Sequence, residues 1–195
     1  MSQTALRAAV CSNTNTRVIR AIGVLGFALA TALGAQIVVP LPHTPVPITA
    51  QTLVVLIAGV SLGARHGAAA MALYLLLGGV GYHAFHAGSW GLCVIAGPTG
   101  GYLLGFLAAQ PVLGALTRPS AGRTPRWPAL LGALLAGHAI IFACGLAWLG
   151  VWSGASLGRT LAMGLWPFLP GAVVKTAVAL AFGLTAGRSI RRWYE

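Results

Sequence analysis

A single lysine lies in an apolar segment near the end of the chain. Lys175 is the only charged residue in the stretch 167–176 and the only lysine among the 195 residues. A cation at the centre of a membrane helix costs roughly 2.5–3.5 kcal/mol on insertion scales, so it requires a partner or an aqueous cavity. The only acidic residue is Glu195, which leaves a backbone carbonyl, water or an external anion as the partner. We therefore expect an anion-binding site at Lys175; extension of the ammonium group to the membrane interface without a ligand is the alternative.

One histidine also lies in an apolar segment. His138 is either a functional group or a neutral histidine that packs two helices together. An intramembrane enzyme would need a nucleophile beside this base, and the sequence contains no G-x-S-x-G pattern. The chain is also no ATPase of the P-loop type, because a P-loop requires glycine directly before its lysine, whereas Val174 precedes Lys175. We therefore predict a solute-binding protein that is not an enzyme and that carries no cofactor; an intramembrane enzyme using His138 is the less favoured alternative.

The composition is that of an integral membrane protein. Hydrophobic residues make up 57% of the chain and charged residues 7%, against roughly 25% charged residues in soluble domains. The net charge of +11 comes from arginines in short stretches between apolar runs, which favours a role in membrane orientation over nucleic-acid binding. The sequence shows no metal site, because neither its outer histidines nor its cysteines have the spacing or the acidic partners that such a site requires. These residues are His43, His83, His86, Cys11, Cys93 and Cys144.

Six apolar runs predict an all-α protein with six transmembrane helices. They cover about 21–39, 51–62, 68–80, 97–116, 129–151 and 167–186, with loops at 81–96 and 152–166. The six runs form one domain over residues 17–195, and the polar, non-periodic residues 1–16 predict a flexible cytoplasmic tail. A cleavable signal peptide is the alternative for the first run.

The basic residues predict the orientation of the chain. With both termini in the cytoplasm, Arg159 lies outside, Lys175 lies within a span, and the other ten basic residues lie inside. This distribution follows the positive-inside rule and places the protein in a bacterial cytoplasmic membrane as a multi-pass protein. The ten inside residues are Arg7, Arg17, Arg20, Arg65, Arg118, Arg123, Arg126, Arg188, Arg191 and Arg192.

This orientation brings three helix beginnings to the outer face. The second, fourth and sixth runs all begin there after prolines, and helix N-termini favour anionic groups. Lys175 follows Pro170 by five residues, roughly 8 Å along a helix, so it lies in the outer half of its span. The glycines of 97–102 allow either close helix packing or close approach of backbone to a ligand. The predicted substrate-binding residues are Lys175, Ala172, Thr44, Pro45, Thr49, Tyr82, His86, Trp90, Gly97, Pro98, Thr99, Gly100, Gly101 and Tyr102.

Small residues recur at a spacing of four in the first run. Gly26 and Ala30 share one face of the expected helix, and Ala28 and Ala32 share a neighbouring one. Small residues allow another helix to approach closely. The pattern therefore predicts either tight packing within the protein or a docking face for a partner protein.

Four segments resemble the BioY family of biotin-binding S components of energy-coupling factor (ECF) transporters. They are the proline-rich stretch 36–53, residues 73–78, the G-P-T-G-G-Y-L stretch 97–103, and F-L-P-G at 168–171 followed by Lys175. The resemblance implies an S-component-like bundle and biotin capture at the outer face. It also implies a complex with a transmembrane coupling subunit and ATP-binding subunits, which use ATP. The small residues of the first helix would contact the coupling subunit.

The sequence departs from this family at two places. Ala172 stands where the family usually has an aspartate, three residues before the pocket lysine. The stretch 81–91 carries Tyr82, His83, His86 and Trp90 where smaller or apolar residues are usual, and His86 or Trp90 is a candidate to compensate. The expected function is biotin binding and uptake, with biotin, membrane lipid and the ECF subunits as partners. The alternative is an S component or secondary carrier for another small carboxylate-bearing solute.

Overall fold

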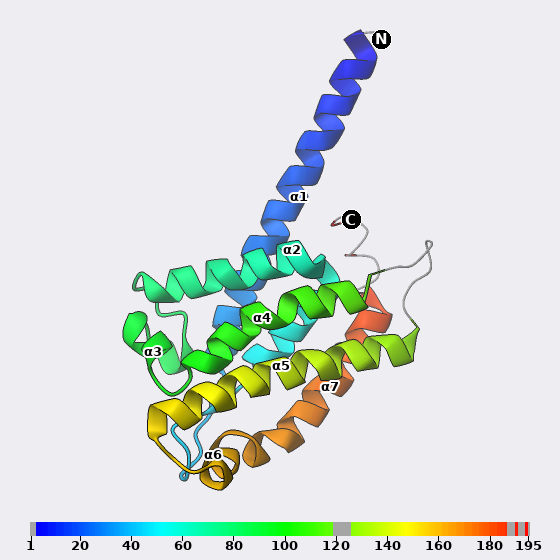
Figure 1. Cartoon of the computed structure of the whole chain (residues 1–195). Helices are drawn as coiled ribbons and strands as arrows, with labels where there is room; N and C mark the ends of the chain where they lie inside the picture. Colours follow the sequence, from blue (N-terminus) through cyan, green and yellow to red (C-terminus); the bar gives the residue numbers. More distant parts are fainter. Residues whose placement is uncertain (1–2, 119–125, 187–189, 191–193, 195) are drawn as a thin grey trace.

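The computed structural model describes residues 3–118, 126–186, 190 and 194. These residues form seven α-helices, two short 3-10 helices and one two-stranded antiparallel hairpin (Figure 1). The α-helices are α1 (Gln3–Gln36), α2 (Gln51–Gly79), α3 (Leu92–Ala96), α4 (Gly100–Leu116), α5 (Trp127–Ser153), α6 (Leu157–Gly164) and α7 (Leu169–Leu184). The other elements are β1 (Val38–Val39), β2 (Ile48–Thr49), η1 (His86–Gly88) and η2 (Trp166–Phe168).

A kink divides α2 into two helical segments. Gly63 has φ 73° and ψ −176°, a conformation that glycine adopts without the steric cost of a Cβ. The halves on either side of Gly63 correspond to the second and third apolar runs of the sequence. Together with α1, α4, α5 and α7 they give six apolar helical segments, which confirms the predicted all-α membrane fold.

The apolar lengths agree with a membrane protein. Four stretches of the described residues are long and apolar enough to cross a membrane, and Gly100–Leu116 is a shorter apolar helix. Large hydrophobic side chains such as Leu33, Leu76 and Val151 are exposed on the helices, as expected for surfaces that face lipid. The four long stretches are Asn15–Gln36, Gln51–Gly79, Trp127–Ser153 and Leu157–Leu184.

Three predicted irregular segments contain helix. α1 begins at Gln3, so residues 3–16 are helical, and this part of α1 projects from the bundle (Figure 1). The prediction of a loop over 152–166 is wrong, because α6 lies within this range. The end of α6 is held by a hydrogen bond of 2.8 Å from the Tyr102 hydroxyl to the Gly164 carbonyl. The loop 81–96 contains η1 and α3. These segments are polar or rich in glycine, so their sequences do not show the periodic apolar pattern that predicts a helix.

The core forms where α4 packs between α2 and α5. Tyr74 of α2 and Phe85 are both fully buried, and their rings meet edge to face with centroids 5.5 Å apart. α3, α6 and the loop between β1 and β2 gather at one end of the bundle (Figure 1), the end that the arginines predict to face outward. The candidate site lies beneath these elements.

Candidate substrate-binding site

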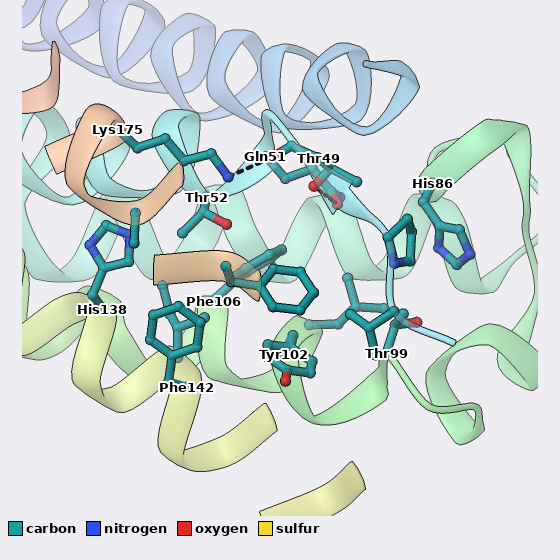
Figure 2. Close-up of a pocket in the computed structure, with 16 residues that line it drawn as sticks. Thr49, Gln51, Thr52, His86, Thr99, Tyr102, Phe106, His138, Phe142 and Lys175 are labelled. Carbon is teal, nitrogen blue, oxygen red and sulfur yellow. Dashed lines mark hydrogen bonds between the residues drawn. The ribbon is translucent and has the colours of Figure 1, made fainter. Parts of the chain in front are cut away.

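A pocket opens between the proline-rich loop and the outer halves of α4, α5 and α7 (Figure 2). Together with its opening to solvent, the empty space is about 620 Å³. The residues that line it are Val46, Pro47, Thr49, Gln51, Thr52, His86, Thr99, Tyr102, Leu103, Phe106, His138, Ile141, Phe142, Phe168, Ala172 and Lys175.

The Lys175 ammonium group donates a hydrogen bond to the backbone carbonyl of Thr49, with an Nζ–O distance of 2.6 Å (Figure 2). This contact joins α7 to the last residue of β2, 126 positions earlier in the chain. It supplies the backbone partner that the sequence left as one of three possibilities. A carbonyl oxygen compensates only part of a cationic charge, so the ammonium group can still attract an anion in the pocket.

The segment that carries Thr49 is itself held in place. Val38 pairs with Thr49 in the hairpin, and the backbone N–H of Ala50 donates to the carbonyl of Gly34 at 3.1 Å. The Thr49 hydroxyl bonds the Gln51 amide oxygen at 3.0 Å, and the Gln51 amide nitrogen donates to the hydroxyl of Tyr74. These contacts fix the loop above the pocket and set the position of the Thr49 carbonyl.

Aromatic and aliphatic side chains form the walls. Tyr102, Leu103 and Phe106 follow one another at helical spacing on α4, so they share one face of the helix. Phe168 stacks against Tyr102 with ring centroids 6.3 Å apart. Ile141 and Phe142 of α5 complete the apolar surface. Such walls suit a solute whose body is apolar and whose polar groups are few.

His138 contributes a second polar group to the pocket. Its Nδ1 lies 3.2 Å from the Thr176 hydroxyl, and its ring stacks on Phe142 with centroids 5.9 Å apart. Its Nε2 is buried and has no hydrogen-bond partner among the described residues. Because an unpaired buried polar atom is costly, this nitrogen is a candidate to bond a ligand or an ordered water.

His86 lines the pocket from the outer loop. Burial lowers the pKa of this imidazole below its ordinary value of 6.5, which favours the neutral form. The loop is attached to α1 by Gln36, whose side-chain nitrogen donates to the carbonyl of Phe85 at 3.2 Å. The structure therefore places a neutral, hydrogen-bonding ring at the mouth of the pocket.

Six of the predicted substrate-binding residues line the pocket, and eight do not. The six are Thr49, His86, Thr99, Tyr102, Ala172 and Lys175. Tyr82 and Trp90 have 65% and 53% of their surface exposed and do not line the pocket, whereas His86, the other candidate to compensate for Ala172, does. Those outside the pocket lining are Thr44, Pro45, Tyr82, Trp90, Gly97, Pro98, Gly100 and Gly101.

The glycines of 97–101 pack helices together. A Cβ on Gly101 would lie 2.2 Å from the Cβ of Trp148, and one on Gly100 would lie 1.8 Å from the carbonyl oxygen of Ile95. The Gly97 carbonyl accepts a hydrogen bond of 2.9 Å from the Trp148 indole nitrogen. Close packing of α4 is therefore the role that the structure supports for these residues.

Most residues of the pocket wall are not among those predicted from the sequence. Gln51 and Thr52 stand at the start of an apolar run, and two adjacent polar residues at an outer helix end are a usable signal of a binding site. His138 was already a candidate functional residue, and Phe142 lies four residues after it and thus on the same face of α5. The other missed residues are Val46, Pro47, Leu103, Phe106, Ile141 and Phe168.

The small residues of α1 divide between surface and core. Gly26 is exposed, and a Cβ there would meet nothing within 4 Å, whereas Ala28 is fully buried in the bundle. Ala30 is half-buried, and Ala32 packs against the core. A docking face on this helix would therefore contain Gly26 and Ala30, and Ala28 is corrected to a core position.

Comparisons with known proteins agree with this architecture. The BioY family model matches residues 6–192. The chain is 38% identical over 162 residues to a biotin transporter BioY of Rhizobium etli, covering 80% of this chain and 86% of that protein. It is 34% identical over 164 residues to a biotin transporter BioY2 of Lactococcus lactis, covering 82% and 88%.

The fold is also similar to a solved structure. The crystal structure of the S-component for biotin from an ECF-type ABC transporter matches with a TM-score of 0.76 and 24% identity, over 91% of this chain and 92% of that one. This match shows the six-helix fold, and the sequence matches over most of the chain show the family. The chain belongs to the BioY family.

Proposed function

We propose that this protein binds biotin at the outer face of the cytoplasmic membrane and serves as the substrate-binding subunit of an ECF-type transporter. The observation that carries the proposal is the outward pocket of a BioY-family chain, in which apolar walls surround the Lys175 ammonium group. Biotin combines an apolar chain and ring system with a carboxylate and a polar urea group. The apolar parts of biotin correspond to the aromatic and aliphatic walls of the pocket, and its polar groups correspond to Lys175 and His138.

Lys175 and His138 are proposed to contact the polar ends of the ligand. The ammonium group supplies a positive charge for a carboxylate or a donor for a urea oxygen, and the unpaired His138 nitrogen offers one further hydrogen bond. Tyr102, Phe106 and Phe142 would cover the apolar body of the ligand. Ala172 leaves the pocket wall beside Lys175 uncharged, so binding there does not require removal of an ion pair.

Partner subunits are proposed to supply the energy for release and uptake. The sequence contains no P-loop, so ATP would be used by the partner ATP-binding subunits. The exposed part of α1 that contains Gly26 and Ala30 is the proposed contact for the coupling subunit, because small residues allow a close helix approach. The apolar outer surfaces of the other helices would face lipid.

Isothermal titration of the purified full chain with biotin tests the binding proposal. Saturable binding at micromolar or lower concentration is expected, and absence of binding in this range contradicts biotin as the ligand. Titration with other carboxylate-bearing vitamins under the same conditions separates biotin from the alternative of a different small acid. Co-purification with a coupling subunit and an ATPase tests the assembly.

A further inference from the structure

Thr176 is buried beside the proposed biotin pocket but does not line it. Its side chain is 7% exposed, and its hydroxyl oxygen lies 3.2 Å from Nδ1 of His138, which does line the pocket. The two residues belong to different helices, α7 and α5, and are 38 positions apart in the chain. Any effect of Thr176 on a ligand therefore acts through the histidine ring.

The Thr176 hydroxyl differs from the hydroxyls of other threonines in the helices and at their ends. A threonine in a helix commonly bonds the carbonyl four residues earlier, and four threonines of this chain do so. In the part of the chain that the structure describes, Thr176 makes no such bond to the Ala172 carbonyl, and its hydroxyl bonds only His138. The four other threonines are Thr31, Thr117, Thr160 and Thr185.

The contact between Thr176 and His138 bears on the position of the imidazole proton. A neutral imidazole carries a proton on one ring nitrogen and accepts a hydrogen bond at the other. If the Thr176 hydroxyl donates to Nδ1, the ring proton is on Nε2, and both partners of the contact are satisfied. The opposite tautomer would turn an Nδ1 proton toward Thr176 or the Leu134 carbonyl, and it would leave the Thr176 hydroxyl hydrogen with no acceptor among the described residues. Because an unpaired buried donor is costly, the Nε2-protonated tautomer is favoured.

The other ring nitrogen of His138 belongs to the polar end of the pocket. Nε2 is buried without a hydrogen-bond partner among the described residues, and stacking on Phe142 supports the ring. His138 lies at the same end of the pocket as Lys175, which acts electrostatically on it (Figure 2). An Nε2–H group and the Lys175 ammonium group are both donors. Together they suit an oxygen acceptor such as that of a carboxylate or a urea group.

We propose that Thr176 is a positioning residue, which holds His138 in the Nε2-protonated tautomer so that the histidine donates a hydrogen bond to an oxygen atom of the ligand. The donation to biotin rests on the proposed function, whereas the tautomer is a property of the protein without ligand. Thr176 thus sets the hydrogen-bonding character of the pocket without contacting the ligand.

The test combines nitrogen NMR with titration calorimetry on the full chain in detergent at pH 8, where an imidazole is ordinarily neutral. Histidine labelled with nitrogen-15 reports which ring nitrogen carries the proton, because protonated and unprotonated nitrogens resonate in separate ranges. The His138 signals are identified by their absence from the spectrum of His138→Gln. Thermal unfolding verifies that each variant is folded.

Two substitutions separate the hydroxyl of Thr176 from its shape. Thr176→Val keeps the branched shape and removes the hydroxyl, whereas Thr176→Ser keeps the hydroxyl. Thr185→Val is the matched control, because Thr185 follows the end of α7, lies outside the pocket lining and bonds the Ala181 carbonyl at 2.9 Å.

We expect Nε2-protonated His138 in the wild type, Thr176→Ser and Thr185→Val, and a mixture of tautomers in Thr176→Val. The affinity for biotin should fall about tenfold in Thr176→Val and stay close to that of the wild type in the other two variants. An Nδ1-protonated or mixed ring in the wild type, or an unchanged tautomer in Thr176→Val, would overturn the positioning role. A changed tautomer with unchanged affinity, or an equal loss of affinity in Thr176→Ser, would contradict donation to the ligand. If the wild type bound no biotin, the proposed function would fail, while the NMR spectra would still decide the role of Thr176.

Discussion

At the scale of single residues, the pocket is defined by a cation that has no acidic partner. Lys175 bonds the carbonyl of Thr49, and the adjacent wall position is Ala172. The charge is therefore positioned by the loop backbone and remains available to an anion. An aspartate at position 172 would instead compete with an external anion for the ammonium group.

Lys175→Ala should weaken biotin binding by about tenfold or more, because it removes a charge-assisted hydrogen bond in the pocket and one attachment of the loop. Titration calorimetry measures the change. Val174→Ala is the matched control, since Val174 is the neighbouring residue on α7, has 63% of its surface exposed, and does not line the pocket. If the affinity of Lys175→Ala for biotin were unchanged, Lys175 would not bind the ligand and would only contact the loop.

Because burial lowers the pKa of the His86 imidazole, we expect the stability of the protein to depend on pH. Burial lowers its pKa in the folded protein below 6.5, so the unfolded chain binds more protons in the window between the two pKa values. The contribution of the neutral His86 ring to the stability of the folded protein is therefore full above pH 6.5, and it is lost as the pH falls through this window. Thermal unfolding between pH 8 and 5 should show a smaller decrease for His86→Gln than for the wild type. Identical decreases would mean that His86 does not contribute.

At the scale of elements, glycines set how closely the helices pack. On Gly101 of α4, an added Cβ would lie 2.4 Å from the carbonyl oxygen of Cys144 of α5 as well as against Trp148. α4 carries Tyr102 and Phe106 into the pocket, so its distance from α5 also determines the pocket width. Helix packing and site geometry are therefore linked through this contact.

Gly101→Ala should destabilise the protein by about 1–3 kcal/mol, because the added methyl group overpacks the contact between α4 and α5. Gly132→Ala on α5 is the control, since nothing lies within 4 Å of the added Cβ and alanine has the higher helix propensity. Thermal unfolding in detergent should give a lower midpoint for Gly101→Ala and an equal or higher one for Gly132→Ala. A midpoint for Gly101→Ala equal to the wild type would show that the helices separate without cost.

At the scale of the whole molecule, two cavities lie at opposite ends of one bundle. The proposed biotin pocket is beneath the proline-rich loop, and an arginine-lined cavity, which contains Arg20, Arg65 and Arg118, is at the kink of α2. The pocket that we propose for biotin therefore lies at the end that is expected to face outward, and the arginine-lined cavity lies at the end that is expected to face the cytoplasm.

The orientation predicts which cysteines react from outside the cell. Cys93 is exposed in α3, at the end predicted to face outward. In a background that carries Cys11→Ala and Cys144→Ala, a membrane-impermeant maleimide should label Cys93 in intact cells. After Cys93→Ala is added to this background, Arg126→Cys should be labelled only once the membrane is permeabilised. The reverse pattern would contradict the predicted topology.

The sequence by itself determined the membrane class, the six apolar segments and the family resemblance, and it made Lys175 a candidate binding residue. These features depend on composition, on apolar run length and on the types of neighbouring residues, all of which are local properties of the chain. The uncharged residue Ala172, three positions before Lys175, was equally visible, and the family resemblance marked it as a departure.

Only the tertiary structure decided which side chains share the pocket. Thr49 reaches Lys175 across 126 positions, and His138 and Phe142 turn toward the same space as Tyr102 and Phe106. A membrane helix is apolar on its lipid face and on its packed face, so its sequence pattern does not define its rotation. Contacts between helices, including the close approach at Gly101, fix that rotation and so select the residues of the site.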